Sequence, residues 1–204
     1  QGLFKAVAVS REDIYFLVRR TINGTDRLFF EQLEYDYYTD CAIKSTNAPA
    51  SAVVVGLSHL NGEESRVRAD GYVLANVTPA IGQATLAEGA FEEIEVGLNF
   101  NPEVTPMPLN TMTPMGANFM EKRRIVDVKA KVRNTLGLLV NGRALPDRYF
   151  DVDDFDAPAT PYTGVHSLEE TTNWDENEEK LVVFTQVDPL PMELLGIQVT
   201  MESS

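Results

Sequence analysis

A serine and a histidine stand side by side at Ser58 and His59, within the stretch VVVGLSHLNGEESRVRADGYVLANV that covers residues 53–77. Such a pair could act as nucleophile and base, but the segment from Gly56 to Leu60 lacks the second glycine of a nucleophile elbow. Neighbouring side chains on a strand also point to opposite faces. The sequence therefore predicts a turn histidine with local hydrogen bonds, and no catalytic residue.

Carboxylates gather in two places in the C-terminal third of the chain. Residues 151–156 hold four aspartates, but Phe155 stands where the EF-hand pattern needs an oxygen ligand, and the turn glycine is missing, so calcium binding stays an open alternative. Residues 175–179 are predicted to form a solvated hairpin tip. A hydrolase that used two carboxylates, such as Asp153 and Glu169, is the least favoured hypothesis.

The composition argues against several other classes of function. Cys41 is the single cysteine, and His59 and His166 are the two histidines, so an internal disulfide and the usual zinc ligand sets are excluded and no cofactor is predicted. A net charge of -14 opposes tight binding to nucleic acid. No apolar run approaches the roughly 18 residues of a membrane span, so no membrane insertion is expected.

The elements that would position these residues are predicted to be strands. Asn-Gly or Asp-Gly pairs at residues 23–24, 70–71 and 141–142 indicate tight β-turns, because both residue types tolerate a positive φ. No stretch keeps the period of a long helix, so the predicted class is all-β. Strands are expected at residues 3–9, 14–20, 27–33, 52–57, 65–69, 72–77, 83–86, 91–100, 124–133, 136–140, 165–168, 180–186 and 194–201.

The spacing of these strands predicts two parts. Short strands with close turns in residues 52–90 indicate a small β-barrel, inserted after a Ser/Ala/Pro linker at residues 45–51 into a larger β-sandwich-like domain made from residues 1–50 and 91–204. The main core is expected to hold Phe16, Val18, Phe29, Val126, Val128, Leu138, Val183 and Ile197. The core of the small barrel is expected to hold Val54, Leu57, Val67, Val73, Val77 and Leu86.

Two surface features favour contacts with other molecules. Residues 101–119 form an unusually long loop rich in Pro and Met, which is either an adaptable contact surface or a flexible excursion without a partner. Alternation in residues 124–133 puts a basic row opposite the apolar face, and this row is either a solvated strand face or a contact to an acidic neighbour. The candidate interface residues are Met107, Met112, Met115, Lys129, Lys131 and Arg133.

Three longer stretches resemble one family when they are taken in order. They are AVVVGLSHLNGEESRVRADG, EKRRIVDVKAKVRNTLGLLVNG and TGVHSLEETTNWDENEEKLVVFTQVDPLPMELLGIQV. Together they resemble the C-terminal part of the tail tubular or nozzle proteins, also called stabilisation proteins, of short-tailed bacteriophages. The residues that carry the resemblance are Gly56-Leu57, His59-Leu60, Gly62-Glu63, Ala69-Asp70-Gly71, Lys122 to Ile125, Thr135 to Leu139, Thr163-Gly164, Trp174 and Asp188-Pro189-Leu190-Pro191.

The resemblance implies a structural protein of the virion tail rather than an enzyme. Its expected partners are copies of itself in a ring and other tail proteins such as an adaptor, spike or needle, with assembly in the cytoplasm of the bacterial host. DNA would pass through the lumen without specific binding, and an acidic lumen would let it slide. Departures from the family are Asn173, where a glycine is usual before the tryptophan, and the long Pro/Met loop.

A binding module directed at a receptor or glycan is the alternative function. Its candidate sugar-stacking residues are Trp174, Tyr149 and Tyr162. The chain starts with Gln1, and members of the family are usually longer, so we expect it to be a segment of a longer protein.

Overall fold

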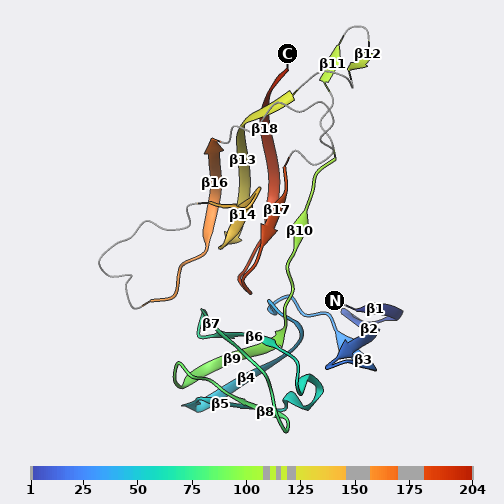
Figure 1. Ribbon diagram of the computed structural model, residues 1–204, viewed down its shortest axis with the longest axis vertical. Helices are drawn as coiled ribbons and strands as arrows, with labels where there is room; N and C mark the ends of the chain where they lie inside the picture. The colour runs from blue at the N-terminus through green and yellow to red at the C-terminus, as the bar shows by residue number, and fades with distance from the viewer. Residues whose placement is uncertain are drawn as a thin grey trace. The chain divides into compact units, whose positions relative to one another are not determined.

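The computed structural model describes residues 2–107, 111–113, 116–118, 123–145, 157–169 and 182–203. These residues form antiparallel sheets, with one short 3-10 helix among them, which confirms the predicted all-β class (Figure 1). The chain divides into two compact units, Gln1–Phe100 and Asn101–Ser204.

The first unit contains a three-stranded sheet followed by a part built from a four-stranded and a two-stranded sheet. The strand order is β1-β2-β3 in the first sheet, β4-β9-β6-β7 in the second and β5-β8 in the third. The elements are β1 (Leu3–Ser10), β2 (Asp13–Ile22), β3 (Thr25–Gln32), β4 (Asp40–Ser51), β5 (Val53–Val55), the 3-10 helix η1 (Leu57–Leu60), β6 (Ser65–Ala69), β7 (Tyr72–Val77), β8 (Gln83–Thr85) and β9 (Phe91–Leu98).

Tight turns shape this unit as the sequence predicts. Asn23 and Gly24 have φ values of 46° and 72°, and they join β2 to β3 with Ile22 opposite Thr25. Asp70 and Gly71 have φ values of 46° and 87° and join β6 to β7. A positive φ at both central residues gives the turn a twist that matches the flanking strands, so the hairpins close without splaying.

The structure places the domain boundary elsewhere than the sequence predicted. Residues 52–90 are not a separate insert, because β6 pairs with β9 and β9 pairs with β4, two strands that the prediction gave to the host domain. The predicted linker at residues 45–51 is the second half of β4. One core, from Ile22 to Leu98, joins these elements, and hydrogen bonding across the sheet outweighs the Ser/Ala/Pro composition that suggested a linker.

Most of the residues predicted for the small core are in place. Val54, Leu57, Val67 and Leu86 are buried, and Val77 packs against them. Val73 is only half-buried, and Leu74 packs against the core instead. The register of β6 and β7 shifts between Ser65 and Val67, and such a bulge changes which side chains face inward.

The second unit is built from two sheets that share one core. The strand order is β16-β13-β18 in one sheet and β10-β17-β14-β15 in the other, and a separate hairpin pairs β11 with β12. Buried residues from both sheets, such as Val128, Leu138 and Phe184, form the core. The elements are β10 (Glu103–Val104), β11 (Thr111–Thr113), β12 (Gly116–Asn118), β13 (Arg123–Thr135), β14 (Leu138–Val140), β15 (Arg143–Ala144), β16 (Tyr162–Glu169), β17 (Phe184–Gln186) and β18 (Leu194–Ser203).

A bulge corrects the predicted alternation at the start of β13. The sequence pattern put Val126 in the core and Ile125 on the opposite face, but Ile125 is fully buried and Val126 is half-buried. The pairing of β13 with β18 shifts between Ile125 and Asp127, which reverses the faces on the N-terminal side of the shift. Val128 and Leu138 are buried as predicted, Ile197 packs against the core, and Val183 is half-buried.

Candidate functional site

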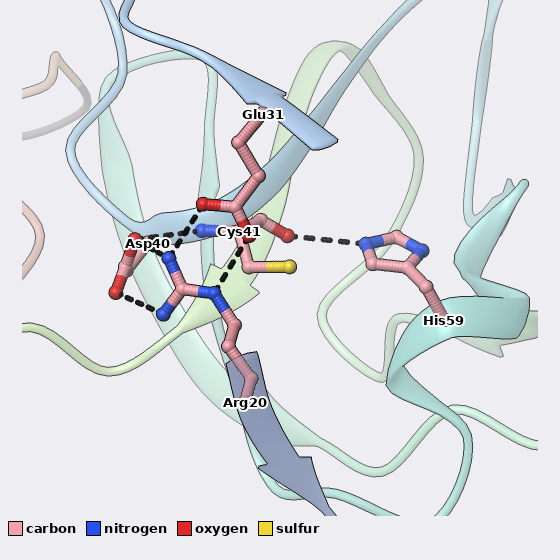
Figure 2. A network of polar contacts seen from close by, with 5 residues as sticks. All are labelled: Arg20, Glu31, Asp40, Cys41 and His59. Atoms are coloured by element: carbon pink, nitrogen blue, oxygen red, sulfur yellow. Dashed lines mark hydrogen bonds and ion pairs between the residues drawn. The ribbon is translucent and has the colours of Figure 1, made fainter. Parts of the chain in front are cut away.

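The buried side chain of Arg20 links the β1-β2-β3 sheet to β4 through ion pairs. Arg20 on β2 donates from Nε and Nη2 to the two carboxylate oxygens of Glu31 on β3, both at 2.6 Å. It also donates from Nη1 and Nη2 to Asp40 at the start of β4, at 2.6 and 2.7 Å. Figure 2 shows the guanidinium between the two carboxylates. Three strands are thus tied together by one side chain that is 3% exposed.

The ion pair between Arg20 and Asp40 favours the charged form of both side chains. Burial by itself would raise the pKa of Asp40, but hydrogen bonds from Arg20 and its positive charge hold that pKa below the ordinary value of 3.8. Burial alone would lower the pKa of Arg20, whereas the hydrogen bonds that Arg20 donates to Glu31 and Asp40 raise it above the ordinary value. Arg20 and Asp40 are therefore stabilised in their charged forms, and the hydrogen bonds of Arg20 to Asp40 and Glu31 link three strands.

The cysteine and histidine beside this cluster do not form a nucleophile and base. His59 lies on η1, a short 3-10 helix where the sequence predicted a turn, and its Nε2 lies 3.1 Å from the carbonyl oxygen of Cys41 (Figure 2). Burial, together with the negative charge of Glu31, raises the pKa of the Cys41 thiol to about 12. The thiol is therefore protonated at neutral pH. The hydrogen bond of His59 differs from the predicted local one, because its partner Cys41 lies 18 residues away on β4.

A second set of buried hydrogen bonds, accepted by Glu95, holds the segment between β3 and β4 in place. Glu95 on β9 is 2% exposed, and its Oε1 accepts hydrogen bonds from the backbone N–H groups of Tyr38 and Thr39 and from the Thr39 hydroxyl, each at 2.7 Å. A Cβ atom at Gly97 would lie 2.5 Å from Thr39 Oγ1 and 2.8 Å from the Asp40 carbonyl oxygen. Glycine is thus required for the close approach of the chain that carries Asp40.

The β1-β2-β3 sheet exposes many large apolar side chains. All eight residues of β1 are exposed, and β1 is an edge strand of its sheet. Large apolar side chains on β1 and β3 face solvent, with exposed fractions of 49% for Leu3, 63% for Phe4, 63% for Val7, 69% for Val9, 62% for Leu28 and 74% for Phe30. An exposed apolar surface of this kind is a candidate interaction site.

The strand register shows how these side chains divide between the two faces. Phe4 lies opposite Val18, so it shares the face that packs inward through β2 and rests edge-on against Phe16, with ring centroids 5.2 Å apart. Phe30 lies opposite Leu17 on the other face and stacks on Tyr15 at 5.3 Å. Each face of the sheet therefore carries an exposed phenylalanine ring that packs against a second aromatic ring.

The candidate interface residues predicted from sequence lie in the second unit. Met107 is 85% exposed, and Met112 lies on β11, whereas Met115 falls outside the described residues. Lys131 on β13 is exposed. The rest of the basic row has acidic neighbours within the chain, because Lys129 Nζ lies 3.6 Å from Asp127 and Arg133 lies 2.5 Å from Glu193.

The neutralised row weakens the expectation of an acidic partner for β13. The stronger candidate surface is the β1-β2-β3 sheet, which the sequence analysis did not single out. A signal for it was present: residues 3–9 are apolar at both odd and even positions, a pattern of strands covered on both faces.

The residues considered for sugar binding or hydrolysis give no assembled site in the described part of the chain. Trp174, Tyr149 and Asp153 lie outside it. Tyr162 is half-buried against the core of its unit, and its ring centroid lies 4.2 Å from that of His166. Among the described residues there is also no group of three or more His, Cys, Asp or Glu side chains that could hold a metal ion.

Comparison with known proteins found no matching family model and no matching curated protein. In the described part of the chain, no helix has the length and apolar character needed to cross a membrane.

Proposed function

We propose that this protein is a structural subunit of a larger assembly, and specifically of a tail nozzle or tail tube of a short-tailed bacteriophage. The observation that carries the proposal is the β1-β2-β3 sheet, which exposes large apolar side chains on both faces while Arg20 holds it in one position. A rigid apolar surface is suited to a permanent contact between subunits. The order of the three nozzle-like sequence stretches supports the more specific form of the proposal.

The chemistry of the best candidate groups also favours a structural role. The Cys41 thiol is protonated at neutral pH, and the carboxylates of Glu31 and Asp40 are bound to Arg20. These groups stabilise the fold rather than offering a nucleophile or a free base. In this proposal DNA passes through the assembly without specific contacts, because the net charge of -14 repels its phosphates.

The test is the presence of the polypeptide in virions. Mass spectrometry of purified phage particles should detect peptides of this chain in stoichiometric amounts, and labelled antibodies should mark the tail in electron micrographs. If purified particles lack the polypeptide, the tail assignment is wrong. A glycan array is the companion experiment, since specific binding to one sugar would favour the alternative function as a glycan-binding module.

A further inference from the structure

Three Asn-Gly pairs occur in the chain, at residues 23–24, 61–62 and 141–142. Asparagine followed by glycine is especially prone to spontaneous deamidation, because glycine has no Cβ atom to crowd the backbone nitrogen that attacks the side-chain amide. The structure distinguishes the three pairs by how their side-chain amides are held.

Two of the three side-chain amides are anchored. Asn61 Oδ1 accepts a hydrogen bond from the backbone N–H of Gly82 at 2.8 Å, and Asn141 Oδ1 accepts one from the backbone N–H of Val183 at 2.7 Å. Both asparagines are half-buried. Either amide must break its hydrogen bond before it can rotate toward the nitrogen of the following glycine, and the N–H group left behind loses its acceptor.

The amide of Asn23 is held differently. Asn23 is exposed, and its hydrogen bond to Glu63 uses the backbone N–H, which donates to Oε2 at 2.6 Å. The side-chain amide lies against Gly62, where a Cβ atom would be 2.8 Å from Asn23 Cγ, and it makes no hydrogen bond within the described part of the chain. No polar contact there opposes its rotation toward Gly24.

Asn23 and Asn141 form a matched pair, because their turns have the same backbone conformation. The φ values are 46° at Asn23 and 72° at Gly24, and 48° at Asn141 and 77° at Gly142. A Cβ atom at either glycine would meet no atom within 4 Å, so neither turn is crowded at the glycine. The anchoring and burial of the asparagine side chain therefore distinguish the two turns.

We propose that Asn23 is the site at which this protein deamidates spontaneously. The backbone nitrogen of Gly24 bonds to Asn23 Cγ and gives its proton to Nδ2, the Cγ–Nδ2 bond breaks, and ammonia leaves behind a cyclic imide. Solvent water then opens the imide at either carbonyl carbon, so the product is aspartate or isoaspartate. This modification goes beyond the structural function proposed above and does not depend on it.

The new carboxylate would lie beside an existing one. Glu63 accepts the backbone hydrogen bond of Asn23, and Gly62 lies against the Asn23 side chain, so deamidation adds a negative charge where the β2–β3 turn contacts the loop after η1. Repulsion between like charges weakens that contact. Deamidation therefore weakens one link between the β1-β2-β3 sheet and the loop that carries Glu63.

Peptide mass spectrometry of the full chain, incubated in heavy-oxygen water at mildly alkaline pH, tests the site. Opening of the imide incorporates oxygen from the solvent, and the peptide with Asn23 should incorporate it about tenfold faster than the peptides with Asn61 or Asn141. The control is the same incubation in urea. Unfolding removes the hydrogen bonds of Asn61 and Asn141, so the three rates should converge.

Two results would overturn the assignment of the site. Equal rates at the three asparagines in the folded chain would show that anchoring does not protect Asn61 and Asn141. A faster rate at Asn23 that persists in urea would assign the difference to neighbouring residues in the sequence rather than to the fold.

Asn23→Asp reproduces the aspartate product and tests its effect. At low salt this substitution should raise the equilibrium constant for unfolding up to about fivefold more in the parent than in a Glu63→Gln background, where residue 63 is neutral and still offers an oxygen to the N–H of residue 23. Comparing the two backgrounds cancels any intrinsic cost of aspartate in the turn. Added salt should shrink the difference, since it screens exposed charges. Equal effects in both backgrounds, measured by urea unfolding, would reject the weakening of the contact.

Discussion

The described residues contain two three-stranded antiparallel sheets, and these differ in whether their large apolar side chains are buried. In the β16-β13-β18 sheet, Val128, Ala130 and Val132 of the central strand are buried in a core shared with a second sheet. In the β1-β2-β3 sheet, all of β1 is exposed and apolar side chains occupy both faces. Equal strand number and equal antiparallel pairing therefore do not lead to equal burial. The difference shows that the β1-β2-β3 sheet leaves exposed on its own unit the kind of side chain that the β16-β13-β18 sheet buries.

The two sheets also use arginine differently. Arg20 in the first sheet is 3% exposed and is held by two carboxylates, while Arg133 in the other is 62% exposed and is paired with Glu193. A buried charge that loses its partner is costly, whereas an exposed pair contributes little. Arginine thus links strands through a buried ion pair in one sheet and forms an exposed surface ion pair in the other.

The largest expected loss of stability follows from removing the buried ion pairs of Arg20. Arg20→Ala leaves Glu31 and Asp40 without their cation, and it should lower the free energy of unfolding by about 3–5 kcal/mol. Arg133→Ala is the matched control and should change stability by no more than the experimental error. Urea unfolding followed by far-UV circular dichroism measures both, and equal effects of the two substitutions would contradict the comparison.

Much of the fold follows from local sequence signals. The Asn-Gly and Asp-Gly pairs mark real turns, and the predicted strands at residues 65–69 and 72–77 agree with β6 and β7. The domain boundary could not be predicted in the same way. It depends on the pairing of β6 with β9, which lies far away in the sequence, and composition at residues 45–51 carries no information about that pairing.

The candidate site was harder to predict than the fold. Arg20, Glu31 and Asp40 are spread over three strands, and no sequence spacing brings them together until β2, β3 and β4 are placed. The bulge at Ile125 likewise depends on pairing with β18 and reverses the predicted faces. The apolar run at residues 3–9 was visible, but burial in a core and burial against a partner leave the same pattern in a sequence.

A second, smaller effect concerns glycines in the two units. Gly97→Ala would force a Cβ atom against Thr39, Asp40 and Ala42, and the resulting shift of the chain should cost about 1–3 kcal/mol. Gly196→Ala on β18 meets no atom within 4 Å and should change the free energy of unfolding by less than about 0.5 kcal/mol. Thermal and urea unfolding of the two variants would measure these changes in stability. A Gly97→Ala variant as stable as the parent would mean that the segment before β4 packs more loosely.

The smallest effect is a dependence of stability on pH that belongs to the first unit. Arg20 holds the pKa of Asp40 below 3.8, so the stability gained from this pair is complete above that pH and is lost as the pH falls through the lower, folded-state pKa. Asp40→Asn should therefore destabilise the protein at pH 7, and its difference from the parent should shrink as the pH drops below 3.8. Asp26→Asn removes an exposed carboxylate 3.9 Å from Arg19 and serves as the control, with a small effect at every pH. A constant difference between Asp40→Asn and the parent from pH 7 to pH 2 would show that Asp40 contributes to stability through packing rather than through its charge.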